Sequence, residues 1–95
     1  MVLYRYAKNH SKRCNIEFNI VPNDIIIPKE CPILKHKFIL NDKQYTYSID
    51  RIDNSKGYVP GNIAVISRLA NIMKNCANFE QLILFSENIK DYIKK

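Results

Sequence analysis

Acidic, basic and amide side chains gather in one short stretch, residues 48–62, and on the segment that follows it. The stretch reads SIDRIDNSKGYVPGN, and Asn71 and Lys74 lie a few residues further on. Asp50 and Asn71 offer a carboxylate and an amide oxygen, hard ligands of the kind that divalent cations prefer. A cation held by these groups keeps positions open for water and a phosphate. The residue types therefore predict metal-dependent hydrolysis of a phosphodiester.

Two basic side chains could assist this chemistry. Lys74 lies three residues after Asn71 on the same expected helical face, where its ammonium could reach the same phosphate. Arg51 could bind a phosphate bidentately and stabilise negative charge in the transition state. A guanidinium cannot be deprotonated in a protein, so Arg51 cannot be an ordinary general base. The alternative interpretation of Asp50, Arg51 and Asp53 is a surface ion-pair cluster that pins the loop and contributes little stability.

The elements that must position these residues are two strands, a loop and a helix. Residues 45–52 alternate apolar and polar side chains, which places Asp50 on the polar face at a strand end. Turn residues occupy positions 53–57, and Pro60-Gly61 makes a second bend. Residues 62–66 form a short apolar strand, and Ser67 is a suitable N-cap for a helix over residues 68–75.

The flanking segments complete an expected α+β fold. Residues 3–14 predict a first helix with a basic stripe, and residues 16–20 a short strand that Pro22 ends. Residues 37–40 predict an extended segment before the strand at 45–52. Asn78 and Gln81 resemble a capping box that opens a final helix. The apolar stripe of that helix is expected to pack in the core, and it comprises Phe79, Leu82, Ile83, Ile89, Tyr92 and Ile93.

Composition bounds the class of protein. The chain has 95 residues, a formal charge of +6 and a pI near 9.3, which favours a single domain with a polyanionic partner. A solvated basic surface with no partner is the alternative. No apolar run is long enough to span a bilayer, and the N-terminus lacks the apolar region of a signal peptide. We therefore expect a cytoplasmic protein that is not secreted and has no membrane partner.

The cysteines Cys14, Cys31 and Cys76 are far apart and form no C-x-x-C pair. Free thiols in a reducing compartment are the favoured interpretation. A structural zinc site would need a fourth ligand, which His10 or His36 could supply, and is the less favoured alternative.

Three short motifs give the pattern a family resemblance. They are Asp50-Arg51-Ile52, Asn62-Ile63 after a Gly-containing loop, and Asn71-Ile72-Met73-Lys74. In order and spacing they resemble the HNH, or His-Me finger, endonucleases. The string DRIDNSKGYVPGN is similar to small HNH-type proteins of bacteriophages, and Cys31-Pro32-Ile33-Leu34 resembles the turn that often precedes their motif. The likeness covers residues 12–85 and is strongest over 48–75.

The resemblance implies one HNH-like domain over residues 1–95. Its core, at about 45–75, would be the ββα-metal motif, a hairpin and a helix around one divalent ion, flanked by an N-terminal and a C-terminal helix. Asp50 and Asn71 match the metal ligands, with Mg²⁺ expected and Mn²⁺ as the alternative. Asn62 matches the middle Asn, which bridges the loop to the backbone and orients the base. The alternative for Asn62 is a plain turn residue that tolerates a strained backbone.

Arg51 departs from the family, because it stands where the catalytic histidine is usual. Proton removal would then pass to another group or to metal-bound water alone. The candidate groups are Asp53, expected on the same strand, Tyr58 in the loop, and His36 on the preceding strand. The sequence alone does not show which of these three groups would be the general base.

The expected function is therefore a phage-encoded endonuclease that nicks or cleaves DNA in the host cytoplasm. Its DNA contacts would be mainly to phosphates, which makes binding weaken with salt. The residues expected to make them are Arg51, Lys56, Arg68 and Lys74. The alternative is a catalytically inactive HNH fold that binds DNA or a protein partner as an accessory or inhibitor. A homodimer could cut both strands, although no sequence feature demands one.

Overall fold

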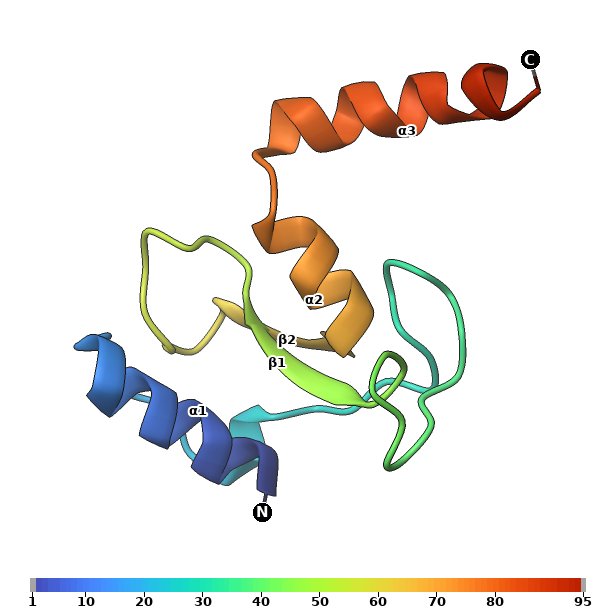
Figure 1. Ribbon diagram of the computed structural model, residues 1–95. Helices are drawn as coiled ribbons and strands as arrows, with labels where there is room; N and C mark the ends of the chain where they lie inside the picture. The colour runs from blue at the N-terminus through green and yellow to red at the C-terminus, as the bar shows by residue number, and fades with distance from the viewer. Residues whose placement is uncertain (1, 95) are drawn as a thin grey trace.

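The computed structural model describes residues 2–94 and has a mixed α+β architecture (Figure 1). A two-stranded antiparallel sheet lies between the N-terminal helix and the helix that follows the second strand. Its elements are α1 (Val2–Cys14), a 3₁₀ turn η1 (Pro22–Asp24), β1 (Tyr47–Arg51), β2 (Ile63–Ser67), α2 (Arg68–Asn75) and α3 (Phe79–Ile93). The expected α+β class is thereby confirmed, as is the order strand, loop, strand, helix within residues 45–75.

The hairpin and α2 form one continuous unit. β1 and β2 pair from Tyr47 opposite Ser67 to Arg51 opposite Ile63, which puts Asp50 at the loop end of β1. α2 begins directly after β2, because the Ser67 side chain caps it and accepts a hydrogen bond from the backbone N–H of Ala70 at 3.2 Å. This cap satisfies an N–H that the helix leaves free, so the chain turns from strand to helix without a connecting loop.

Two small apolar clusters hold α1 and α2 against the hairpin. One joins Ala7 of α1 to Tyr58 of the β1–β2 loop and Val65 of β2, together with Ile20 and Ile25. The other comprises Cys31, Ile66 and Ala70. Because the first cluster includes both α1 and the loop, burial of apolar surface fixes α1 beside the loop end of β1.

The strands expected at residues 16–20 and 37–40 are absent from the described chain. Phe18 makes only an isolated bridge to Tyr58, and Lys37 makes one to Glu30. The loop approaches residues 17–19 at a single point, where Tyr58 N–H donates to Glu17 O and Asn19 N–H donates to Tyr58 O, both at 2.8 Å. Alternation of side chains is insufficient for a strand when no second segment runs alongside.

The strand expected at 45–52 is shorter than predicted and begins at Tyr47. The Asp42 carboxylate accepts hydrogen bonds from the backbone N–H groups of Gln44, at 2.8 Å, and Tyr45, at 2.7 Å. These bonds hold residues 42–45 in a turn, since the side chain competes with a strand partner for the same donors.

The prediction that α3 packs in the core is wrong. Figure 1 shows α3 projecting from the end of α2, away from α1 and the sheet, and none of its residues is buried. Leu82 and Ile89 are half-buried, whereas the rest of the predicted stripe is exposed, namely Phe79, Ile83, Tyr92 and Ile93. The expected capping box of Asn78 and Gln81 is present. Among residues 2–94, no helix has the length and apolar character needed to cross a membrane.

Candidate functional site

A groove of about 810 Å³ lies where α1, β1, α2 and the β1–β2 loop meet. It contains one carboxylate, from Asp50, and three arginines, Arg13, Arg51 and Arg68. Its volume is within the range of natural ligand sites. The excess of guanidinium groups makes the groove suited to a phosphate or another anion. The remaining polar lining comes from His10, Thr46, Ser48, Asn54, Asn71 and Asn75, with Tyr6, Tyr47 and Tyr58 among the ring side chains.

Asp50 is the buried charge of this groove. Its residue surface is 4% exposed, and its Oδ1 atom lies 3.2 Å from the Lys74 ammonium. Burial raises the pKa of Asp50 above its ordinary value, although Lys74 and Arg51 both act to lower it. Within residues 2–94, the Lys74 hydrogen bond to Oδ1 is the only one that the carboxylate accepts. The Oδ2 atom accepts no hydrogen bond from the described residues and is the oxygen that a further ligand could use.

Asn71 lines the same groove from α2. Its amide nitrogen donates to Ser48 Oγ at 2.7 Å and to Ile49 O at 3.4 Å, which fixes the side chain against β1. Its Oδ1 atom accepts a hydrogen bond from Asn75 Nδ2 at 2.7 Å. A metal ion on Asn71 Oδ1 would have to displace or share this donor, since a cation and an N–H group compete for the same lone pairs.

These side chains fit a Mg²⁺-type ion with few protein ligands. In the part of the chain that the structure describes, no three His, Cys, Asp or Glu side chains come together to hold a metal. Asp50 and Asn71 both line the groove, and each offers a hard oxygen donor. Mg²⁺ is commonly bound through one or two carboxylates while it retains several waters and takes substrate phosphate oxygens. The donor set suits such an ion and not a closed protein cage.

Asn62 holds the loop between β1 and β2. It is 6% exposed; its Oδ1 accepts from Asp53 N–H at 2.9 Å, and its Nδ2 donates to Asp53 O at 3.1 Å and Gly57 O at 2.9 Å. The side chain thus bridges both sides of the loop. The positive φ of the turn, +87°, belongs to Gly61 and not to Asn62. Of the two interpretations of Asn62, the observed contacts are those of the bridging residue.

Arg51 is engaged with the loop backbone. Its Nη1 atom donates to Asn54 O at 3.2 Å and to Lys56 O at 3.1 Å. Its Cζ atom lies 5.6 Å from the centroid of the Tyr58 ring. The expected alternative of an Asp50–Arg51–Asp53 ion-pair cluster is not what the described residues form, because Asp50 pairs with Lys74 instead. Arg51 holds the loop through carbonyl groups and still lines the groove.

The three candidates for the general base lie in different surroundings. Asp53 follows the end of β1, not on it as expected, and its Oδ1 accepts from Ser55 Oγ and Ser55 N–H at 2.7 and 2.9 Å. These bonds lower its pKa. Tyr58 is buried beside Arg51, and burial raises the pKa of its hydroxyl. His36 is on no strand; its ring lies 4.4 Å from that of Tyr45. Of the three, only Tyr58 lines the groove.

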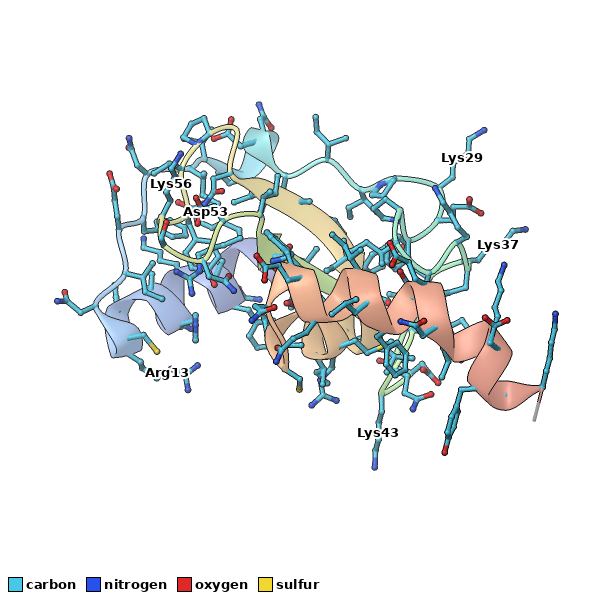
Figure 2. All side chains as sticks on the ribbon, turned by 90° about the horizontal axis from the view of Figure 1, so that it is seen from above. Arg13, Lys29, Lys37, Lys43, Asp53 and Lys56 are labelled. Carbon is cyan, nitrogen blue, oxygen red and sulfur yellow. The ribbon has the colours of Figure 1, made fainter. Side chains whose placement is uncertain are left out.

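The expected DNA-contacting residues are not all on one surface. Arg51 and Arg68 line the groove, and Arg68 Nη1 also donates to Lys43 O at 3.1 Å. Lys74 points inward to Asp50 and donates to Arg51 O at 3.1 Å. Figure 2 shows Lys56 and Asp53 at the same end of the molecule as Arg13, with Lys29, Lys37 and Lys43 at the other end. The positive charge is thus spread along the molecule, with the groove as its arginine-rich part.

The cysteines lie on separate parts of the fold. Cys31 is fully buried in the second apolar cluster, and Ser67 N–H donates to its sulfur at 3.4 Å. Burial acts to raise the pKa of Cys31, but hydrogen bonds from the Leu34 and Ser67 backbone outweigh it and lower the pKa to about 7. Cys14 is exposed at the end of α1, and Cys76 is exposed at the C-cap of α2.

Sequence reasoning missed the contribution of α1 to the groove. His10 and Arg13 line it, together with Leu3, Tyr6 and Ala7. These positions recur at helical spacing and therefore share one face of α1. The basic stripe of Arg5, Lys8 and Lys12 drew attention to another face, and all three of those residues are exposed. The missed signal was the face that carries Ala7, His10 and Arg13.

Comparison with known proteins yields one distant relative. An uncharacterized 29.0 kDa protein in the dda-modA intergenic region of Enterobacteria phage T4 is 31% identical to the chain over 77 residues. The match covers 81% of the chain but 31% of the phage protein, so the chain spans about a third of that relative's length. No family model matches the chain, and no solved structure matches it.

Proposed function

We propose that the protein is an HNH-like endonuclease, a His-Me finger enzyme that hydrolyses DNA phosphodiester bonds with Mg²⁺ or Mn²⁺. One observation carries the proposal: the buried carboxylate of Asp50 and the amide of Asn71 line one arginine-rich groove. They come from β1 and α2, in the strand, loop, strand, helix order of the family that the sequence resembles. Assignment of this unit as a ββα-metal motif, within a single domain, is part of the proposal. The similarity to a phage protein supports a phage origin.

The groove arginines provide the phosphate contacts. Arg13, Arg51 and Arg68 approach from three elements, so a strand of DNA in the groove meets positive charge on several sides. Arg51 uses Nη1 for the loop carbonyls of Asn54 and Lys56. A guanidinium carries five N–H donors, so the others remain for two oxygens of one phosphate. Lys56 at the loop adds a further charge near this end of the groove.

Asp50 Oδ2 and Asn71 Oδ1 would hold the cation. Once bound, a divalent ion neutralises charge on the scissile phosphate and polarises a water molecule. Lys74 keeps the Asp50 carboxylate oriented through its 3.2 Å contact, and Asn62 joins the two sides of the β1–β2 loop. These two side chains would thus hold the metal ligand and the loop in fixed positions, and fixed positions of the reacting groups are a large part of catalysis.

The test is nicking of supercoiled plasmid by the purified protein with Mg²⁺ or Mn²⁺. The unmutated protein is expected to convert supercoiled to open-circular DNA, and EDTA to stop it. Asp50→Ala should reduce the rate at least about 100-fold, the scale of a lost metal-ligand or catalytic group. Asp91→Ala is the matched control, because Asp91 is an exposed carboxylate on α3. Equal nicking by Asp50→Ala and the unmutated protein would indicate a contaminating nuclease.

A second candidate function is a catalytically inactive HNH fold that binds DNA or a protein. The occupation of the catalytic histidine position by Arg51, whose guanidinium holds the loop, favours it. The expected signature is DNA binding that weakens with salt, without metal-dependent nicking at any pH. Binding to a labelled duplex and plasmid nicking, measured on the same sample, separate the two functions.

A further inference from the structure

We propose that His10 of α1 is the proton acceptor for the attacking water, in place of the histidine that Arg51 replaces. The inference rests on the proposed endonuclease function. Its structural basis is that α1, outside the strand–loop–strand–helix unit, places an imidazole on the wall of the groove that contains Asp50 and Asn71.

The Tyr58 ring fixes His10 beside the Arg51 position. The His10 and Tyr58 ring centroids lie 6.3 Å apart, with the ring planes at 86°. The Arg51 Cζ atom lies 5.6 Å from the centroid of the same Tyr58 ring. One buried aromatic ring thus contacts both side chains, and both line the groove. His10 and Arg51 are therefore both neighbours of the Tyr58 ring within one groove.

Cys14 orients the imidazole. Its sulfur lies 3.8 Å from His10 Nδ1, one helical turn further along α1. In the tautomer with the proton on Nδ1, this nitrogen donates to the sulfur and Nε2 keeps its lone pair. In the other tautomer the thiol donates to Nδ1, so the contact restrains the orientation of the ring in both, and the proposed base is the tautomer that carries its proton on Nδ1.

The other groups of the chain are worse placed for this role. His10 and His36 are its two histidines, and His36 lies against Tyr45 and Phe38, outside the groove lining. Asp53 also lies outside the lining and is engaged by Ser55. Burial raises the pKa of Tyr58, which makes its phenolate rarer. Imidazole is the side chain that exchanges a proton near neutral pH.

The step conserves atoms and charge. A water in the groove gives one proton to His10 Nε2, and its oxygen forms a bond to the phosphorus. The bond between phosphorus and the leaving sugar oxygen breaks, and the electron pair stays on that oxygen. The sugar oxygen takes a proton from solvent water, and the imidazolium then returns its proton to solvent. The products are a phosphomonoester and a hydroxyl end.

Charged and titratable groups from each neighbouring element face the same groove. Arg13 of α1, Asp50 and Arg51 of β1, Tyr58 of the loop and Arg68 of α2 line the groove together with His10, and Cys14 of α1 contacts the His10 ring. A change in the pH dependence of the His10 variant must be compared with that of the His36 variant, because both variants keep all of these other groups.

The experiment measures plasmid nicking with Mg²⁺ as a function of pH for His10→Ala and for His36→Ala. His10→Ala is expected to lower the rate at least about 100-fold, the usual scale of general-base catalysis. The unmutated protein is expected to lose rate at acid pH through protonation of its base, and His10→Ala should lack this loss. Imidazole added to the buffer should restore part of the rate, because it can enter the space that the side chain leaves. His36→Ala should keep the rate and the pH profile of the unmutated protein.

Two further measurements separate proton transfer from folding and binding. His10→Gln fills the same space and forms hydrogen bonds, but it cannot accept the proton, so it should be as slow as His10→Ala. Thermal melting identifies a variant that fails to fold, in which case the His10→Gln result decides. The affinity for duplex DNA without metal should change less than about threefold in either variant, because His10 is proposed to accept a proton and not to bind DNA.

Each outcome has a definite meaning. Nicking by folded His10→Ala or His10→Gln at the unmutated rate and pH profile would overturn the inference, while an inactive Asp50→Ala would leave the proposed function standing. A rate loss matched by an equal loss of DNA affinity, with no rescue by imidazole, would also overturn it. Absence of metal-dependent nicking by the unmutated protein would overturn the proposed function, and the inference with it.

Discussion

Lys74 of α2 reaches across to β1 and forms an ion pair with Asp50, with Nζ 3.2 Å from Oδ1 and the two side chains only 12% and 4% exposed. The same ammonium donates to Arg51 O at 3.1 Å. A pair this far from water contributes little net stability, because both charges lose hydration. Its effect is to hold the carboxylate in place with one oxygen engaged.

The burial of Asp50 leads to a pH prediction. Burial raises the pKa of Asp50, so the folded carboxyl binds its proton more tightly than the unfolded one. The protonated Asp50 carboxyl group therefore contributes its full stability below the ordinary aspartate pKa of about 4. This contribution is lost as the pH rises through the pKa of Asp50 in the folded protein. In EDTA, the melting temperature of the unmutated protein should fall relative to Asp50→Asn as the pH rises above about 4. A difference that stays constant or changes in the opposite sense would contradict this.

The position of Lys74 beside Asp50 also leads to a prediction about the affinity for a cation. Mg²⁺ at Asp50 Oδ2 would lie within a few Å of the Lys74 ammonium, which repels it. Lys74→Met should therefore tighten Mg²⁺ binding about tenfold or more, since charges at such distances interact by more than ~1 kcal/mol at an effective dielectric constant near 20. Isothermal titration with Mg²⁺ measures this. Lys90→Met, at an exposed position on α3, is the control and should leave the affinity unchanged.

Asn62→Ala should destabilise the protein. The substitution removes three hydrogen bonds and leaves Asp53 N–H and the carbonyls of Asp53 and Gly57 without that partner. A buried polar group that loses its partner costs about 1–3 kcal/mol, so a loss of at least ~2 kcal/mol is expected in urea unfolding. Asn54→Ala, at an exposed position in the same loop, should cost less. Equal losses for both variants would argue against the bridging role of Asn62.

The two glycines of the loop should respond differently to alanine. A Cβ atom at Gly57 would meet Glu17 O at 2.5 Å and Glu17 Cβ at 2.6 Å, so the loop must move away from residues 17–19. Such overpacking typically costs about 1–3 kcal/mol. Because Tyr58 is the next residue, Gly57→Ala should also reduce nicking.

Gly61 provides the matched comparison. At this position φ is +87°, but no atom lies within 4 Å of the added Cβ. Gly61→Ala should thus show only the cost of the left-handed backbone, on the order of 1 kcal/mol. Urea unfolding of both variants checks the stabilities. A nicking defect in Gly61→Ala as large as in Gly57→Ala would show that the contact with Glu17 is not the cause.

Removal of α3 should have little effect on the rest of the fold. None of its residues is buried, and Figure 1 shows it projecting from α2. A chain that ends at Ala77 should melt within about 4 °C of the longer protein, which corresponds to less than ~1 kcal/mol for a domain of this size. Circular dichroism during heating measures this. A much larger decrease would mean that α3 packs on the domain in solution.

The sequence by itself determined the local structure. The alternation over residues 47–51, the Ser67 cap, the Asn78–Gln81 capping box and the glycine turn before Asn62 all act between residues close in the chain. Such short-range hydrogen bonds and side-chain periodicities depend only on residues that are close in the sequence. The hairpin, α2 and the start of α3 could therefore be predicted from them. The groove placement of Asp50, Asn71 and Arg51 followed from the same local order.

Only the tertiary structure decided which distant surfaces meet. The face of α1 that carries His10 and Arg13 packs beside the loop because Ala7, Tyr58 and Val65 bury apolar surface together. The segment at 16–20 is no strand because only Tyr58 pairs with it, and the stripe of α3 stays exposed because no described surface covers it. Such contacts depend on the apolar surface that residues far apart in the chain bury together. A pattern within a short stretch of sequence does not contain this information.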